Sequence, residues 1–422
     1  MHQLLTLKNH QVKKLELGIT VLLFFYYLGP NVPQSVIQAG ALFGYLTVPL
    51  LIIRYWKRFF WVATRDLPLL FLTVSVPISV LWSTSPEFTI AHSRAFLCST
   101  AFGIYLATRY TAKEQMRLLI WWFGIYTFVN LMLPLFLPSY GVSRGAWTGL
   151  TKYKNSLAAT MVIATTLFLD IGFYNRKYRW TALIGATIAF IILVLSKGKG
   201  SLGIFIGMLP LLPVYKIAKQ EYKLRTFLGI CALSILAVII LATVINLEFI
   251  VVDLLEKDMG FNGRESLWDY LIERGLERPW LGYGYAGFWT NPIEGLGVAI
   301  AAPWLGGAGE GGGNAHSSYI ETFLQLGWLG LSLLALSLFM LTIRVVLLLG
   351  LTRQIEFFWI LQFLLVLAML SYFDSMGFLS ERNLLWVLYV SSACSTAIHL
   401  NRIFKTGNKF VNLQFENRQP HA

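Results

Sequence analysis

Residues 317–343, SSYIETFLQLGWLGLSLLALSLFMLTI, decide the fold class of this chain. Glu321 is their one formally charged residue, and the run exceeds the roughly 20 apolar residues that a helix needs to cross a bilayer. Comparable apolar runs cover residues 15–29, 34–53, 67–82, 92–108, 116–137, 155–174, 180–196, 200–215, 226–247, 357–376 and 383–400. We therefore expect about twelve transmembrane helices, of which the third, seventh and eighth have the least defined ends.

The composition supports the same fold class. With 56% hydrophobic and 13% charged residues and a mean hydropathy of +0.62, the chain differs from a soluble globular domain, in which about a quarter of the residues are charged. Only helices and closed barrels satisfy the backbone in lipid, and these runs are too long and too continuously apolar for barrel strands. We predict an all-α polytopic integral membrane protein in which residues 1–422 form a single membrane domain. Gly29, Pro30 and a second apolar run follow the first run in place of a cleavage site, so the first run should remain as an anchor.

The distribution of Lys and Arg among the loops predicts the orientation. Most of these residues fall on one face, which is cytoplasmic by the positive-inside rule, so both termini are expected inside. The long loop at residues 248–316, between the ninth and tenth helices, is then outside. Because topology accounts for most of the net charge of +13, this charge does not indicate nucleic-acid binding.

Basic residues also occur on the outer face, where orientation does not require them. They are Arg94, Arg144, Lys152, Lys154, Lys197, Lys199, Lys257, Arg264, Arg274, Arg278 and Arg382. Several adjoin the start of a helix, and a charge at membrane depth costs at least about 2.5 to 3.5 kcal/mol, so it usually faces a protein interior with a partner. The alternative for each residue is to extend its charge to the lipid headgroups. Their recurrence in separate loops favours a shared anionic ligand.

The long outer loop contains three distinct segments. Residues 263–278 begin with a polar cap and an acidic turn and then place apolar side chains at helical spacing, which predicts an amphipathic helix at the membrane surface. Trp280 and Tyr283 follow it, and such aromatics are typical either of the membrane interface or of contacts with sugar rings. Residues 306–313 are rich in glycine and suit either a lid over a site or a flexible link.

His316 begins the tenth helix, and Ser317, Glu321 and Gln325 follow at a spacing of four residues. This spacing places the three polar side chains on one helix face, which should point into the bundle, where Asp374 near the end of the eleventh helix can join them. A single His at a helix start is more often structural, but its unperturbed pKa also suits general-base chemistry near neutral pH. The polar line, the basic loops and the glycine-rich segment together favour a functional site around His316.

Motifs in and after the long loop resemble the O-antigen ligase and polymerase superfamily of bacterial cell-envelope enzymes. The sequence HS at 316–317, followed after nine residues by GWLG at 327–330, is similar to a signature of the ligase type. That signature is His, then Asn or Ser, nine residues, Gly, two residues, and Gly or Thr. The sequence GRESLW at 263–268, continuing to RPWLGYG at 278–284, is similar to the family's loop helix and Pro-x-x-Gly-x-Gly turn.

Earlier segments resemble the same superfamily. The sequence RGAWTG at 144–149, leading to KN at 154–155, looks like the family's Arg-Gly and Lys-Asn entrance to a central helix. The sequences WS at 82–83 and LATRY at 106–110 resemble the exopolysaccharide-polymerase branch in particular.

The resemblance extends over about residues 70–395, and it depends on the combination of motifs because each one alone is weakly specific. Two departures occur. The sequence KGKG at 197–200 stands where relatives often have Ser-Arg-Gly, and Tyr153 stands where His commonly precedes Lys-Asn. Basic character is retained at the first place, so we expect the charge to be kept with different individual contacts.

The resemblance implies a glycosyltransferase of the bacterial inner membrane. Such an enzyme moves a glycan from an undecaprenyl-diphosphate carrier to an acceptor hydroxyl on the periplasmic face. Guanidinium groups bind phosphate oxygens bidentately, so Arg144 and Arg264 are predicted to hold the diphosphate, supported by Lys154, Lys197 and Lys199.

For the chemical step, His316 is the predicted general base, and Glu321 or Asp374 is predicted to orient it or tune its charge. Further predicted contacts with the acceptor or the sugar are Ser317, Trp280, Tyr283 and Arg382. The reaction requires no metal or other cofactor. No carboxylate is clearly placed as a covalent nucleophile, so backside attack should invert the anomeric carbon.

The substrate pair stays open at this point. A polymerase uses a second lipid-linked glycan as acceptor, a ligase uses lipid A-core, and a protein-glycosylating relative uses a Ser or Thr hydroxyl; the branch-specific motifs favour the polymerase. A secondary transporter is the alternative of another class, because twelve helices with both termini inside also describe many carriers. Against a transporter, the two halves of the chain show no similarity, and the largest loop is expected outside with a His at its root. A purely structural membrane protein comes third, and the polar line argues against it.

Overall fold

The computed structural model describes residues 2–220, 264–290, 292–302, 313–375 and 377–416, and over these ranges the chain is nearly all helical. Its helices are α1 (His2–Tyr27), α2 (Gln34–Ile53), α3 (Trp56–Ala63), α4 (Leu67–Ile78), α5 (Pro86–Arg109), α6 (Ala112–Phe136), α7 (Pro138–Gly141), α8 (Lys154–Tyr174), α9 (Arg179–Leu195), α10 (Lys199–Met208), α11 (Val214–Ala218), α13 (Arg264–Glu277), α14 (Pro292–Ala301), α15 (Ser318–Thr352), α16 (Ile355–Phe373) and α17 (Leu384–Glu416). The 3₁₀ turns are η1 (Ser79–Leu81), η2 (Arg176–Tyr178), η3 (Leu209–Leu211) and η5 (Phe288–Thr290). One antiparallel hairpin, β1 (Val142–Ser143) with β2 (Ala146–Trp147), is the exception to the all-α prediction.

Eight helices in these ranges are long and apolar enough to cross a membrane, or nine if the pair α3 and α4, bent by 100°, counts as one span. The predicted number of about twelve is therefore not confirmed. The runs at 15–29 and 92–108 do form helices, within α1 and α5, but polar and charged side chains leave both helices short of the composition of a membrane span. The run at 226–247 and the glycine-rich residues 306–312 lie outside the part of the chain that the structure describes.

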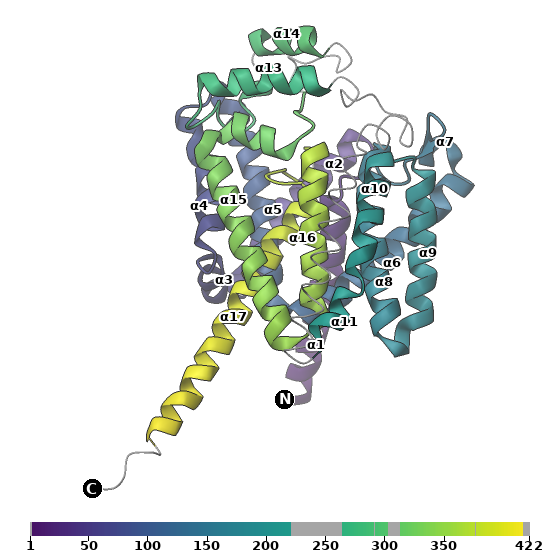
Figure 1. The fold of residues 1–422 in the computed structure, drawn as a ribbon, viewed down its shortest axis with the longest axis vertical. Coiled ribbons are helices and arrows are strands. Elements are labelled where there is room, and N and C mark those ends of the chain that lie inside the picture. Colours follow the sequence, from purple (N-terminus) through teal and green to yellow (C-terminus); the bar gives the residue numbers. More distant parts are fainter. Residues whose placement is uncertain (1, 221–263, 291, 303–312, 376, 417–422) are drawn as a thin grey trace.

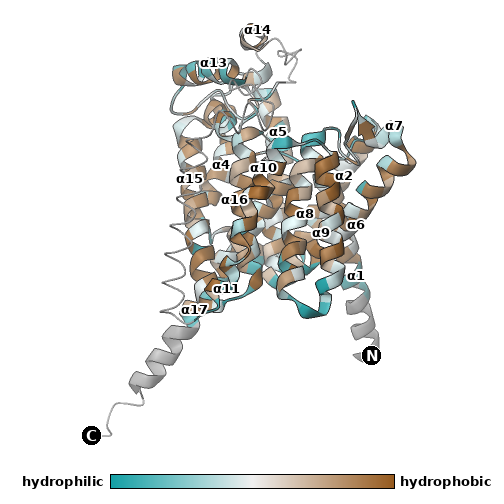
Figure 2. Ribbon diagram, turned by 45° about the vertical axis from the view of Figure 1, so that its right-hand side comes forward, coloured by the Kyte–Doolittle hydropathy of each residue, from teal (hydrophilic) through white to brown (hydrophobic). Residues whose placement is uncertain are grey.

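The helices form a bundle with the loop elements at one end. Figure 1 shows α13 and α14 lying across that end, while the start of α1 and the end of α17 lie at the other. In Figure 2 hydrophobic residues fill the middle of the bundle, and hydrophilic residues gather in the loops at its two ends. This distribution is what a bilayer requires of a helical protein. The orientation itself, with the end that carries α13 outside and both termini in the cytoplasm, stays a prediction.

The buried helix α8 organises one half of the bundle. It packs against α6, α9, α10 and α16, and most of its side chains are buried. The strand β2 contacts both α8 and α9, so the hairpin lies next to the start of α8. A Cβ atom placed on Gly145 would lie 3.7 Å from Nζ of Lys197, which shows that the hairpin also adjoins the link between α9 and α10.

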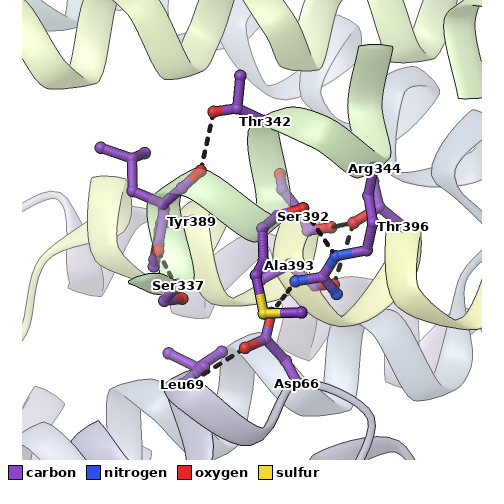
Figure 3. Close-up of polar contacts among 11 residues, drawn as sticks. Asp66, Leu69, Ser337, Thr342, Arg344, Tyr389, Ser392, Ala393 and Thr396 are labelled. Atoms are coloured by element: carbon purple, nitrogen blue, oxygen red, sulfur yellow. Dashed lines mark hydrogen bonds and ion pairs between the residues drawn. The ribbon is translucent and has the colours of Figure 1, made fainter. Parts of the chain in front are cut away.

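The helix α15 is longer than the apolar run predicts, and its extension contains a buried ion pair. The run predicts an end at residue 343, with Arg344 in a cytoplasmic loop, whereas α15 continues to Thr352 and keeps Arg344 inside the bundle. Arg344 pairs with Asp66, which caps α4 by accepting the Leu69 N–H at 3.0 Å (Figure 3). Nη1 of Arg344 also donates to the carbonyl of Ala393 at 3.2 Å. This residue therefore connects α15 to both α4 and α17.

Candidate functional site

A break at Gly327 separates the first turns of α15 from the rest of the helix. The backbone there has φ 61° and ψ −158°, a region that is essentially open to glycine alone. In an unbroken helix, the N–H groups of Trp328 and Leu329 would donate to carbonyls four residues earlier. They donate instead to the outer loop, to the carbonyls of Pro279 at 2.7 Å and Trp280 at 3.2 Å.

The two carbonyls released by this break are also taken up by the loop. The carbonyl of Leu324 accepts the Tyr283 N–H at 2.8 Å, and the carbonyl of Gln325 accepts the Gly284 N–H at 3.0 Å. Four hydrogen bonds to the turn at residues 279–284 thus replace two hydrogen bonds of the helix. These hydrogen bonds join the turn at residues 279–284 to the helix bundle at the break in α15.

The fit between turn and break leaves no room for side chains at the glycines. A Cβ atom on Gly327 would lie 2.3 Å from the carbonyl carbon of Trp280, and one on Gly282, which has φ 67°, would lie 2.5 Å from the carbonyl oxygen of Leu324. Real Cβ atoms do not approach other atoms so closely. Both motif glycines are therefore required by the same close backbone contact.

His316 stands where the loop enters α15, and the residue before it is held on both sides. The Ala315 N–H donates to Oε2 of Glu321 at 2.9 Å, and the Ala315 carbonyl accepts Nε1–H of Trp268 in α13 at 2.8 Å. The N–H of His316 itself donates to Oδ1 of Asn314 at 2.9 Å. These contacts fix the backbone that carries the imidazole.

The residues after His316 are fixed to the loop that follows α16. The N–H of Ser317 donates to Oγ of Ser375 at 3.1 Å. Ser318 donates through its N–H at 3.2 Å and through Oγ at 3.0 Å to the carbonyl of Asp374, and its Oγ accepts the Gly377 N–H at 3.1 Å. The structure thus places the main chain of Asp374 beside the start of α15, and the participation of its side chain in the polar line stays a prediction.

Two members of the predicted polar line, Glu321 and Gln325, are joined by a hydrogen bond. Ser317 and Gln325 are buried, and Oε1 of Glu321 accepts hydrogen bonds from Nε2 of Gln325 and from Nε1 of Trp289, both at 2.7 Å. With the Ala315 bond, the carboxylate of Glu321 accepts three donors. These contacts connect Glu321 to the segment before His316, to the outer loop and to the next turn of α15.

Arg264 is the cation that acts on His316. It begins α13, and its guanidinium donates a hydrogen bond to the carbonyl of Phe373 at the end of α16. Burial lowers the pKa of Arg264, while the charge of Asp374 acts in the opposite direction. Burial first and the charge of Arg264 second lower the pKa of His316 from 6.5 to about 4. At neutral pH the imidazole is therefore uncharged and keeps a nitrogen lone pair able to accept a proton.

Residues 184–335 match the family model described as O-antigen ligase. The matched segment contains α13, the turn at 279–284, His316 and the break at Gly327. It supports the O-antigen ligase and polymerase superfamily that the motifs indicate, and with it a membrane glycan transferase in place of a transporter. No curated protein matches the chain.

Part of the predicted diphosphate site lies in the O-antigen ligase segment and part outside it. Lys197, which is exposed, and the half-buried Lys199 flank the link before α10, inside the matched range. Arg144 at the hairpin tip and Lys154 at the start of α8 are exposed and precede it. The hairpin places Arg144 next to the Lys197 link, whereas Arg264 lies beside His316. The predicted diphosphate ligands therefore fall into two groups, one near the start of α8 and one, Arg264, at the start of α13.

Backbone geometry marks several of the same residues. Seven non-glycine residues of the described chain have positive φ, and four of them are predicted site residues: Arg144, Lys197, His316 and Arg382, with φ between 48° and 54°. A side chain in this region costs on the order of 1 to 2 kcal/mol, and such costs concentrate at functional sites.

The predicted sugar contacts differ in exposure. Trp280 is 73% exposed, whereas Tyr283 is buried and donates its hydroxyl to the carbonyl of Arg274 at 3.0 Å, so a sugar can reach its ring only after local rearrangement. Arg382 is half-buried, with Nη2 3.3 Å from Oε1 of Glu381. No group of three or more His, Cys, Asp and Glu side chains placed to hold a metal occurs among the residues with described positions, so we assign no metal ligands there.

Sequence reasoning missed the supporting residues. In the sequence Trp268 and Trp289 are aromatic positions of the outer loop without an assigned role, whereas in the structure each donates its indole N–H to the segment around His316. Ser375 was missed because nothing in the sequence relates it to Ser317, which lies 58 residues earlier. The one sequence signal for the two tryptophans was their position, in the loop helix and in the aromatic segment that follows it.

Proposed function

We propose that the protein transfers a glycan from undecaprenyl diphosphate to an acceptor hydroxyl on the periplasmic face, and that it is a polysaccharide polymerase. The observation that carries the proposal is an uncharged His316 beside Arg264, at the root of a helix whose break is fixed to the outer loop. A base next to an anion-binding cation is the arrangement that glycosyl transfer from a diphosphate needs. The O-antigen ligase match over the same residues supports it.

In the proposed step, the acceptor hydroxyl oxygen attacks the anomeric carbon from the side opposite the diphosphate. The new C–O bond forms as the bond from the anomeric carbon to the diphosphate oxygen breaks, and the electron pair leaves with the diphosphate. The hydroxyl proton passes to His316. The anomeric carbon is inverted, and this chain's own residues supply the charge stabilisation without a metal ion.

The cations divide the stabilisation of the leaving group. Arg264 has the planar donors that match two phosphate oxygens, and burial strengthens its attraction for an anion. Lys197, Lys199, Arg144 and Lys154 supply further positive charge from the side of α8.

Donor binding also affects the base. Because the charge of Arg264 is one of the two causes that lower the pKa of His316, a diphosphate bound to Arg264 offsets that cause. The pKa of His316 then rises, and the imidazole becomes a stronger base when the donor is in place. Glu321 and Asp374 contribute by holding the segments on which His316 and Arg264 sit.

The test is His316→Ala in purified protein reconstituted with a lipid-linked donor and acceptor. Transfer should fall by about 10²-fold or more, while donor binding is retained. The matched control is His399→Ala in α17, which is a His outside the site and should transfer normally. Unchanged turnover in His316→Ala would exclude the general-base assignment.

A second candidate is the ligase reaction, because the matching family model is described as O-antigen ligase. The two differ in their acceptor. A polymerase extends glycans when lipid-linked repeat units are the sole glycan supplied, whereas a ligase makes no product until lipid A-core is added. Chain-length analysis of the products with and without lipid A-core therefore separates them.

A further inference from the structure

A cavity of about 660 Å³ lies beside the proposed site, between the α1–α2 link, the start of α8 and the loop before α17. Its walls are mainly aromatic and aliphatic, and include Phe25, Tyr26, Tyr27, Val36, Ile37 and Phe123. Two cations, Lys152 and Arg382, line it, and none of the described residues that line it is acidic. An apolar cavity with cationic groups suits a molecule that has both a hydrocarbon chain and a phosphate.

Positive charge extends around Arg382. A second hollow of about 720 Å³, lined by Arg94, shares Arg382 with the first. Glu381 is the one nearby carboxylate among the described contacts, with Oε1 3.3 Å from Arg382 and 3.0 Å from Nδ1 of His92. Three cations against one carboxylate leave this region net positive, and the guanidinium of Arg382 retains donors beyond the one that faces Glu381.

The position of the cavity allows a lipid to enter from the bilayer. One wall is α2, which is largely exposed along a stretch apolar enough to cross the membrane. A cavity of this size accommodates one narrow chain and its head, and not the several acyl chains of lipid A. A polyprenyl chain with a phosphate head fits this description.

The cavity is joined to the His316 site by a short piece of main chain. Oγ of Ser318 accepts the Phe378 N–H at 3.3 Å, and the four Cα-to-Cα steps from Phe378 to Arg382 span at most about 14 Å. Tyr285 lies along this path, since its hydroxyl donates to the carbonyl of Leu379 at 2.7 Å. A phosphate at Arg382 would therefore place the sugar that it carries within reach of the base.

We propose that this cavity binds the acceptor, as the phosphate head and first prenyl units of a second lipid-linked glycan. The inference rests on the proposed transfer reaction and assigns Lys152 and Arg382 to the acceptor. The donor diphosphate keeps Arg264 on α13, with Lys154 two residues after Lys152 at the start of α8 as a supporting charge. A reaction between two lipid-linked substrates requires two phosphate-binding regions, here one that contains Arg264 and one that contains Arg382. Lys152 and Arg382 hold the head, and the aromatic wall holds the chain.

The first experiment measures binding without transfer. A polyprenyl diphosphate without sugar, carrying a diazirine on its first prenyl unit, is photolysed with the protein in neutral phosphatidylcholine nanodiscs. Label should appear in peptides from residues 25–40 and 152–160. In the Lys152→Gln, Arg382→Gln double variant the amount of label in these peptides should fall at least about 10-fold.

Lys177→Gln is the matched control for this experiment. Nζ of Lys177 lies 5.2 Å from the ring centroid of Tyr178, beyond the far end of α8, and Nζ of Lys152 lies 5.3 Å from that of Tyr153. The control should keep full labelling. Equal labelling of the double variant, or equal displacement of the probe by phosphatidylglycerol, would overturn the acceptor site.

The second experiment separates acceptor from donor. A lipid-linked repeat unit with a methylene in place of the anomeric oxygen cannot lose its diphosphate, so it acts only as an acceptor. In the double variant the KM for this acceptor should rise at least about 10-fold while the KM for the donor stays unchanged. The reverse pattern would overturn the acceptor assignment. Labelling at the cavity in a wild-type protein that transfers nothing would instead refute the proposed function, which distinguishes the two failures.

Discussion

Replacing Gly327 by Ala should uncouple the outer loop from the bundle while leaving α15 helical. In the native chain, the N–H groups of Trp328 and Leu329 donate to the turn at residues 279–284. A side chain at residue 327 favours ordinary helical geometry, in which these two N–H groups return to carbonyls four residues earlier. The turn then loses all four of its hydrogen bonds to the break.

The size of the effect follows from the geometry at Gly327. The φ of 61° and ψ of −158° cost a non-glycine residue roughly 1 to 3 kcal/mol. Straightening the helix exchanges four hydrogen bonds for two, and each of the two extra bonds stabilises the broken form by about 0.5 to 1.5 kcal/mol. Ala at residue 327 weakens these bonds, because its Cβ would lie 2.3 Å from the Trp280 carbonyl carbon and the two segments must move apart. The backbone cost alone therefore shifts the equilibrium between broken and straight α15 towards the straight helix by about 5- to 150-fold. Loss of the contact at Trp280 shifts it further.

Amide hydrogen exchange and a transfer assay test this prediction together. In Gly327→Ala, the amides of Tyr283 and Gly284 should exchange rapidly, those of Trp328 and Leu329 should stay protected, and transfer should fall at least about 10-fold. Gly124→Ala is the control, because a Cβ atom there meets nothing within 4 Å. Unchanged protection at Tyr283 and Gly284, together with full activity, would refute the reasoning.

Three further predictions concern the site and its support. The pH profile of kcat/KM should fall in acid with a midpoint near pH 4, since neutral His316 is the active form and its pKa is lowered to about 4. In Arg264→Gln the midpoint should move up by only part of the interval to 6.5, because burial, the larger cause, remains; an unmoved midpoint would contradict the effect of the Arg264 charge on His316. Glu321→Gln replaces one accepting carboxylate oxygen by an amide NH₂, which cannot accept the N–H groups that face it. Transfer should therefore slow by about 10-fold while the glycan donor still binds, and a fully active variant would contradict the proposed positioning function of Glu321. Arg344→Met leaves the buried carboxylate of Asp66 unpaired and should cost about 3 to 5 kcal/mol, measured as a lower midpoint of thermal unfolding, whereas Arg344→Met with Asp66→Leu should recover most of it; equal loss in both would exclude the ion pair as the cause.

The parts of the structure that follow from local spacing were accessible from the sequence. The four-residue spacing of Ser317, Glu321 and Gln325 placed them on one helix face, and the structure joins Glu321 to Gln325 on that face. The apolar run at 67–82 indicated membrane depth but not the 100° bend that α4 forms with the helix before it. Hydropathy counts apolar side chains and carries no information about the angle between successive helices.

The contacts that position His316 were inaccessible because they depend on chain segments distant in sequence. Trp268 lies 47 residues before Ala315, and Ser318 lies 56 residues before Asp374. Periodicity relates a residue only to neighbours within a few turns, so neither contact leaves a periodic signal. The Lys152 and Arg382 cavity escaped notice for the same reason, since its two cations are 230 positions apart.

The turn at 279–284 and the signature that begins at His316 are best understood as two halves of one contact. Each half alone is a weak motif: the turn has two glycines in a tight loop, and the signature has a glycine eleven residues after the His. Their backbone groups exchange four hydrogen bonds, and a Cβ atom on Gly282 or Gly327 would enter the partner segment. A sequence that keeps one half therefore has a physical reason to keep the other. His316 directly precedes the turns of α15 that lie before the break, and Arg264 begins the loop helix that lies before the turn, so this contact connects the two segments that carry them.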